Sequence, residues 1–163
     1  MHLKIDPRGL PPEGQHFEGT MPASVFQLEP NDPVKALSPL RYALDVMRDE
    51  DELIVTGSLE ATFELGCGRC AEPFHHRMEI PDYTLEVEIE NDQPVDLTTW
   101  LREDILLALP TYPRCEDGNI QPRECPAEGR FEDAPETIVI EPHEDKDDAV
   151  WEALDQLKNL KRN

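Results

Sequence analysis

The sequence has few basic residues for its length. Of its 163 residues, 15 are Lys or Arg and 36 are Asp or Glu, which gives a formal net charge of −21. Non-specific binding to nucleic acid depends on Lys and Arg that neutralise phosphates, and binding to an anionic membrane surface depends on the same residues. The charge therefore opposes both kinds of binding and favours a basic partner.

Long apolar runs are also missing. Residues 105–109 form one of the longest runs, whereas a transmembrane helix needs about 20 apolar residues. The first seven residues contain no apolar core of a secretory signal. These observations predict a cytoplasmic protein without a membrane segment.

The sequence contains none of three common catalytic signatures. It has no Gly-rich phosphate-binding loop, no G-x-S-x-G and no H-E-x-x-H. Carboxylates are so frequent that no hydrolytic pair can be singled out. We therefore expect a protein that is not an enzyme, and we keep a metal-dependent RNA-processing enzyme as the alternative.

Proline and acidic residues limit regular structure at both ends of the chain. Residues 1–39 contain seven prolines, which interrupt helices and interior strands. We expect this N-terminal part of the domain to form loops, short edge strands at residues 3–5 and 16–18, and one helical turn at 23–28. Residues 115–148 carry 12 acidic and three basic residues, a composition that predicts a partly disordered acidic segment.

Residues 40–114 are the predicted β-rich core. Apolar and polar residues alternate over residues 42–46, 53–65, 74–80 and 83–89. This period is typical of antiparallel strands with one buried and one wet face. Gly57 fits a β-bulge within the second stretch. Because no strand–helix–strand rhythm occurs, a parallel nucleotide-binding sheet is not expected.

Two helices complete the predicted α+β fold, an antiparallel β-sheet packed against one buried helix, with a C-terminal helix. Asp96 can cap the first helix, over residues 97–109, and Pro110 ends it. The second helix lies within residues 149–163, where an apolar stripe includes Trp151. The apolar face of the first helix, which we expect to be wide and well buried, comprises Leu97, Trp100, Leu101, Ile105, Leu106, Ala108 and Leu109.

The four cysteines are the clearest candidates for a site. Cys67 and Cys70 enclose a two-residue turn between predicted strands, and this spacing can point both sulfurs at one ion. Cys115 and Cys125 could supply a second pair and complete a tetrahedral Zn²⁺ site. Unliganded thiols and a disulfide or redox pair are the alternatives. A redox pair is disfavoured because it needs the first cysteine at a helix start, whereas strand-like alternation follows Cys70.

His75 and His76 follow the cysteine turn. Adjacent residues on a strand point to opposite faces, so at most one of them could join a metal site. We expect both to be ordinary polar residues beside Arg69 and Arg77.

Several segments resemble the YceD family, the large ribosomal RNA subunit accumulation proteins. Residues 65–74 resemble the family's C-x-R-C-x-x-P/x-F segment, and residues 95–110 with Pro113 to Cys115 resemble its second block. Residues 150–158 are similar to its terminal helix. Many members have a fuller cysteine cluster after the third cysteine, of which only Cys125 and Pro126 are found here.

The resemblance implies a role in the accumulation of large-subunit (23S) rRNA, without a known catalytic reaction. Together with the charge, it favours a ribosome-biogenesis factor that binds a basic large-subunit ribosomal protein or a precursor particle. Direct RNA binding through a basic spot of Arg69, His75, His76 and Arg77 is the weaker alternative. The candidate partner-binding residues are Arg69, Phe74, Arg77 and Trp151.

Overall fold

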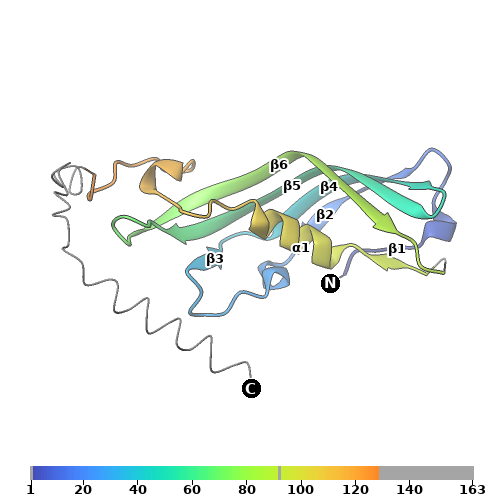
Figure 1. Ribbon diagram of the computed structural model, residues 1–163, viewed down its shortest axis with the longest axis horizontal. Helices are drawn as coiled ribbons and strands as arrows, with labels where there is room; N and C mark the ends of the chain where they lie inside the picture. The colour runs from blue at the N-terminus through green and yellow to red at the C-terminus, as the bar shows by residue number, and fades with distance from the viewer. Residues whose placement is uncertain (1, 92, 129–163) are drawn as a thin grey trace, which may run out of the picture. The chain divides into compact units, whose positions relative to one another are not determined.

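A computed structural model describes residues 2–91 and 93–128, which form an α+β fold dominated by antiparallel strands (Figure 1). The predicted C-terminal helix, with Trp151, lies outside the described residues. The elements in chain order are β1 (Lys4–Ile5), η1 (Pro7–Gly9), β2 (Gln15–Met21), η2 (Ala23–Phe26), β3 (Val34–Ala36), β4 (Leu40–Asp49), β5 (Glu52–Gly66), β6 (Pro73–Glu88), β7 (Val95–Asp96), α1 (Thr98–Leu107) and η3 (Cys115–Asp117).

The main sheet is built around β5. Strands β4 and β3 pair with successive stretches of one side of β5, and β6 pairs with its other side. Strand β2 extends the sheet beyond β4, and β1 pairs separately with β7. All these pairings are antiparallel, as the alternating pattern of residues 42–89 predicts.

One face of this sheet carries the core. Leu44, Val55 and Phe63 are completely buried, and the Phe63 ring meets Phe26 of η2 edge-on at a centroid distance of 5.0 Å. The other face carries charged rows, such as Lys35–Glu64, whose Nζ and Oε1 lie 3.0 Å apart. The predicted division into a buried and a wet face is therefore confirmed.

The stretches predicted at residues 74–80 and 83–89 belong to one strand, β6, interrupted by a bulge. Leu59 pairs with Ile80 but Gly57 pairs with Tyr83, so Ser58 alone faces two residues of β6. The inward-facing positions of β6 consequently change from even to odd numbers at this point. A bulge therefore occurs beside Gly57, as predicted, but its extra residue lies in β6 and not in the strand that contains Gly57. Gly57 itself has a φ of 149°.

Helix α1 lies over the core face of the sheet (Figure 1). It begins beside Asp96, whose Oδ1 accepts a hydrogen bond of 3.0 Å from the Thr98 backbone N–H. Tyr83 of β6 donates a 2.6 Å hydrogen bond to Asp104 Oδ2 of the helix, and burial and this bond raise the pKa of Tyr83. The Tyr83–Asp104 hydrogen bond thus ties α1 to β6.

The buried face of α1 is narrower than the sequence predicts. Leu101 and Ile105 are completely buried, but Trp100 is 38% and Leu107 is 79% exposed. Each residue turns a helix by about 100°, so the residues next to Leu101 and Ile105 point sideways or outward from a helix that covers only one layer. The helix also ends at Leu107, two residues earlier than expected.

The described structure continues through residue 128, into the segment predicted to be partly disordered. Cys115, Cys125 and Ala127 are buried there, because this part of the chain packs against the cysteine turn. Residues 129–148 of that segment lie outside the described residues. Among the described residues, no helix has the length and apolar character needed to cross a membrane.

Candidate metal centre

Four cysteines meet at the turn between β5 and β6. Cys67 directly follows β5 and Cys70 precedes β6, while Cys115 opens η3 and Cys125 lies in the chain beyond it. Their four Sγ atoms all lie within 4.8 Å of one another. The structure thus brings together all four residues that the sequence suggests as metal ligands, and this cluster can hold a metal ion.

The sulfur separations fit tetrahedral coordination. A Zn–S bond of about 2.3 Å in a tetrahedron places neighbouring sulfurs about 3.8 Å apart. The Cys67 and Cys125 Sγ atoms are 3.9 Å apart, and those of Cys70 and Cys115 are 3.6 Å apart. A disulfide would need about 2.05 Å, so all four cysteines carry free thiols.

The backbone of the turn aims N–H groups at the first sulfur. The Cys67 N–H bonds the Glu72 carbonyl and the Ala71 N–H bonds the Cys67 carbonyl, at 2.9 and 2.8 Å, which closes the turn. The Arg69 N–H then points at Cys67 Sγ, 3.4 Å away. Burial would raise the pKa of Cys67, but N–H groups of Cys70 and Arg69 outweigh it and lower that pKa to about 6.

The pKa values of the other two buried thiols, Cys115 and Cys125, shift upward. Burial raises the pKa of Cys115, and its hydrogen bonds with Cys70 and Cys67 raise it further. Burial likewise raises the pKa of Cys125. Several thiolates cannot lie so close together without a cation, because their charges repel. A bound divalent ion would lower the thiol pKa values and deprotonate the thiols that bind it.

Arg123 supports the cluster from outside. Its Nη2 donates to Cys115 Sγ at 3.4 Å, and its Nη1 donates to Glu72 Oε2 at 2.6 Å. The guanidinium therefore links the segment after α1 to the turn that carries Cys67 and Cys70. It also supplies positive charge next to sulfurs that would be anionic in a metal complex.

A family model described as "Large ribosomal RNA subunit accumulation protein YceD" matches residues 78–158. The chain belongs to the YceD family. The match includes Cys115 and Cys125, whereas Cys67 and Cys70 precede it. No curated protein matches the chain, and no solved structure matches it.

Membership of the YceD family implies a role in the accumulation of large-subunit ribosomal RNA. The family is described by this role and not by a chemical reaction.

Two of the candidate partner-binding residues have structural roles within this YceD protein. Phe74 is only 5% exposed, so its ring belongs to the interior and offers no surface to a partner. Arg69 donates from Nη1 to Glu116 Oε1 at 3.2 Å, within the cysteine site. Arg77 stays exposed on the outer face of the sheet, where Glu60 and Glu79 each lie 3.8 Å from its guanidinium.

The two adjacent histidines point to opposite sides of β6, as expected. His75 Nε2 lies 3.7 Å from Glu64 Oε2, and His76 Nδ1 lies 2.6 Å from the Asp117 carbonyl oxygen. Neither belongs to the thiol cluster. Each histidine thus contacts a neighbouring oxygen atom and lies outside the group of four thiols.

Asn119 holds the second pair of cysteines in place, and sequence reasoning missed it. The Arg77 N–H donates to Asn119 Oδ1 at 2.7 Å, and Asn119 Nδ2 donates to the Arg77 carbonyl at 2.8 Å. The side-chain amide thus pairs with the open edge of β6 as a neighbouring strand would. No motif or spacing in the sequence predicts this contact, because it joins residues 42 positions apart.

We expect Asn119→Ala to loosen this attachment without disrupting the sheet. Losing hydrogen bonds of this kind costs about 1 kcal/mol, which corresponds to a roughly fivefold increase in local opening. Hydrogen exchange measured by NMR should show faster exchange at the Arg77 amide. Gln121→Ala, at an exposed neighbour, is the control, and equal exchange rates in both variants would contradict the role given to Asn119.

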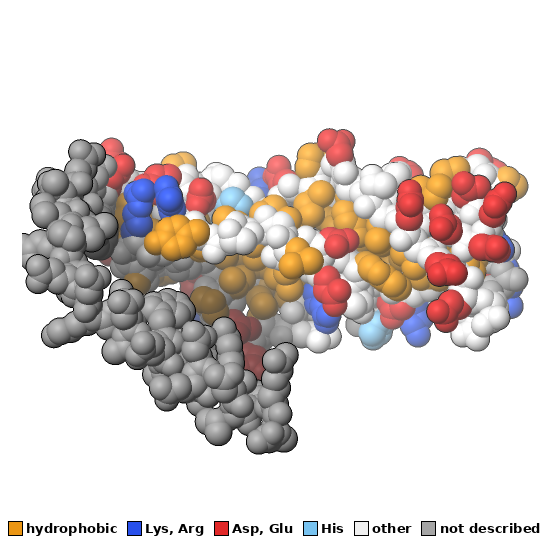
Figure 2. Space-filling view, in the orientation of Figure 1, with side chains coloured by type: hydrophobic (Ala, Val, Ile, Leu, Met, Phe, Trp, Pro, Cys, Tyr) orange, Lys and Arg blue, Asp and Glu red, His pale blue; other side chains and the backbone are white. Residues whose placement is uncertain are grey.

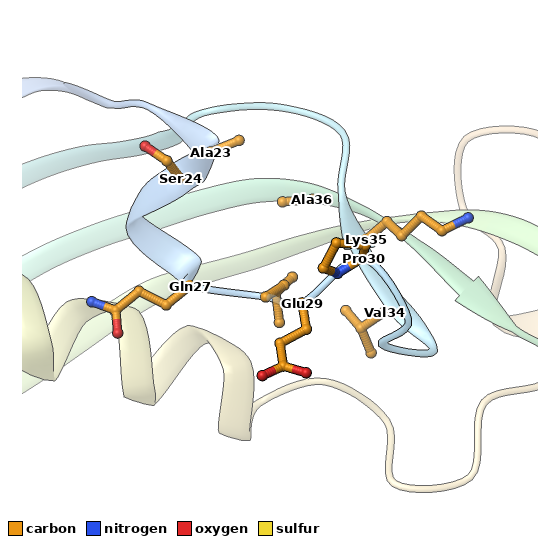
Figure 3. A pocket seen from close by; sticks show the side chains of 9 residues that line it. Ala23, Ser24, Gln27, Glu29, Pro30, Val34, Lys35 and Ala36 are labelled. Carbon is orange, nitrogen blue, oxygen red and sulfur yellow. The ribbon is translucent and has the colours of Figure 1, made fainter.

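A separate hollow of about 320 Å³ lies between η2 and β3. Figure 3 shows the Glu29 carboxylate on one side of it and the Lys35 side chain extending away from the other labelled residues. Lys35 instead bonds Glu64 on the outer face. The hollow therefore presents no convergent set of polar groups of the kind that catalysis requires.

Proposed function

We propose that this YceD protein is a non-catalytic ribosome-biogenesis factor that binds a basic large-subunit ribosomal protein or a precursor particle in the cytoplasm. The observation that carries the proposal is the net charge of −21 in a family named for accumulation of large-subunit RNA. An acidic surface suits a partner rich in Lys and Arg, and it speeds their encounter.

A group of acidic side chains lies at one end of the described structure. Figure 2 shows them gathered over the end opposite the cysteine turn, where β4 turns into β5 and where β6 ends. Asp49 faces Glu52, and Glu52 faces Glu88, across these three strands. Such a surface supports binding of a cationic protein segment and opposes contact with RNA phosphates.

We further propose that the cysteine cluster holds a structural Zn²⁺ ion. Thiolate sulfur in a tetrahedral set of four is typical of structural zinc, and it leaves no coordination position for water or substrate. This argues against the metal-dependent RNA-processing alternative. The ion would join residues 115 and 125 to the β5–β6 turn and so stabilise the fold.

Direct RNA binding through the basic spot has weaker support. Arg69 is paired with Glu116, and Arg77 lies between Glu60 and Glu79. His75 lies next to Glu64. A phosphate at this spot would have to compete with carboxylates already in place.

The test is affinity purification of the tagged, full-length protein from its own cells, followed by nuclease treatment and mass spectrometry. We expect basic large-subunit ribosomal proteins to remain bound after the RNA is digested, and to dissociate as salt rises from about 50 to 200 mM. Recovery of large-subunit components only while the RNA is intact would overturn the proposal in favour of RNA contact.

A further inference from the structure

A second pocket lies between the end of β6 and the start of α1, at the acidic end of the described structure. It has a volume of about 600 Å³ and is lined by both apolar and acidic residues. Three of the lining residues, Glu88, Glu90 and Trp100, are exposed to solvent. We propose that this pocket receives an arginine or lysine side chain of the basic partner, an inference that rests on the proposed function.

The walls of the pocket suit a long cationic side chain. Trp100 lines it and is 38% exposed, although its position on α1 led us to expect a buried residue. Indole is the aromatic ring that attracts cations most strongly. Pro94, which is exposed, also lines the pocket and offers apolar surface to the methylene stem of Arg or Lys.

Two carboxylates at the pocket are available to an incoming cation. Asp96 is already engaged, because it accepts from Thr98 and lies 2.8 Å from His2 Nδ1. Glu88 and Glu90 have no Lys, Arg or His partner among residues 2–91 and 93–128. A guanidinium between them would form charge-assisted hydrogen bonds, which are stronger than neutral ones.

The position of Glu88 is also unfavourable for the isolated fold. It faces Glu52 directly across β5 and β6, and Glu52 in turn faces Asp49 of β4. Like charges directly opposite each other destabilise a sheet. A sequence that keeps three carboxylates in one cross-strand row on the wet face is less stable there than it could be, as sequences are at functional sites.

Tryptophan fluorescence gives a direct test on the full-length chain. Trp151→Phe leaves Trp100 as the one tryptophan, because the sequence contains two. The probe is a synthetic nonapeptide of alternating Arg and Gly, and a Glu–Gly peptide is the negative probe. We expect a saturable change in Trp100 emission with the Arg peptide alone.

Two pairs of variants then distinguish binding in the pocket from general attraction by the negative charge. In the same background, Glu88→Gln with Glu90→Gln should weaken binding of the Arg peptide about tenfold. Glu18→Gln with Glu79→Gln changes the net charge equally at exposed sites elsewhere and should weaken it less than twofold. For Trp100, affinity measured by calorimetry should fall in the order Trp, Phe, Leu, because Phe retains an aromatic face.

Two results would contradict the proposed binding of a cationic side chain in this pocket and would leave the proposed function intact. One is an equal loss of affinity in the two glutamate pairs, which would show diffuse attraction. The other is unchanged capture of basic ribosomal proteins from cells by the Glu88→Gln, Glu90→Gln variant. Failure of the wild-type protein to capture any basic ribosomal protein would instead overturn the proposed function itself.

Discussion

Replacing Cys115 with serine should abolish metal binding and release residues 115–128 from the sheet. The Cys115 side chain is completely buried and its sulfur lies 3.6 Å from that of Cys70. A serine hydroxyl does not ionise near neutral pH and is a poor ligand for zinc, so three thiolates would remain around the ion. Structural zinc sites bind through four protein ligands, and burial prevents water from replacing the fourth easily.

Metal content and local hydrogen exchange measure this effect. The wild-type protein should contain about one zinc ion per chain, and the Cys115→Ser variant should contain almost none. Amide exchange should rise over residues 112–128 but remain slow in β4 and in the part of β5 that pairs with β4, because these hydrogen bonds lie away from the cysteine turn. Treating the wild-type protein with a chelator should produce the same exchange pattern.

Ala127→Ser is the matched control. Ala127 is buried close to Cys125 in the sequence, so this variant introduces a hydroxyl into the same region and keeps all four thiols. It should retain its zinc. Purified wild-type protein without stoichiometric metal, or a Cys115→Ser variant that keeps it, would contradict the zinc assignment.

The metal centre and the proposed cation pocket can be tested independently because they lie at opposite ends of β6. The cysteine turn precedes Pro73, and Glu88 ends the strand. Sixteen residues of extended chain span about 50 Å. Loss of zinc should therefore leave binding of the Arg peptide unchanged, provided that the sheet remains folded.

The strands could be predicted because their signal is local. In residues 59–65 every second residue is apolar, and this period alone determines which face is buried. The position of the bulge along the sheet could be anticipated from Gly57. In β6 the apolar residues stand at even positions up to Ile80 and at odd positions from Tyr83, and this shift is visible in the sequence. Such patterns need no knowledge of the tertiary structure.

The metal centre could be predicted only in part. The spacing of Cys67 and Cys70 marks one half of a site, but the convergence of Cys115 and Cys125 depends on how the chain returns after α1. Asn119 and Arg123 could not be found at all, because their partners at Arg77 and Glu72 are distant in the sequence. Long-range contacts of this kind leave no periodic trace.

The burial of the apolar residues of α1 could also not be predicted fully from the sequence. The sequence reveals that Trp100, Leu101, Ile105 and Leu107 are apolar, but not how many layers cover the helix. In the described structure only the face with Leu101 and Ile105 meets the sheet. The exposure of Trp100, on which the cation pocket depends, therefore emerges only from the fold.

Replacing Gly57 with alanine should destabilise the protein by about 3 kcal/mol or more, at the upper end of single substitutions. A Cβ atom at this position would lie 2.1 Å from the Ala43 carbonyl oxygen and 2.9 Å from the Leu44 Cα. The φ of 149° is itself unfavourable for a residue with a side chain. Since Gly57 pairs with Leu44 on one side and Tyr83 on the other, relief would require the central strands to separate.

Gly66→Ala is the matched control for this prediction, because Gly66 lies in the same strand and a Cβ there would meet nothing within 4 Å. Its free energy of unfolding should stay within about 1 kcal/mol of the wild-type value, with a small gain possible from the stiffer unfolded chain. Urea denaturation followed by circular dichroism measures both variants. Equal changes in the free energy of unfolding for the two alanine variants would contradict the prediction. The close packing at Gly57 would then not be what constrains β4, β5 and β6, and the change from even to odd inward-facing positions along β6 would need another cause.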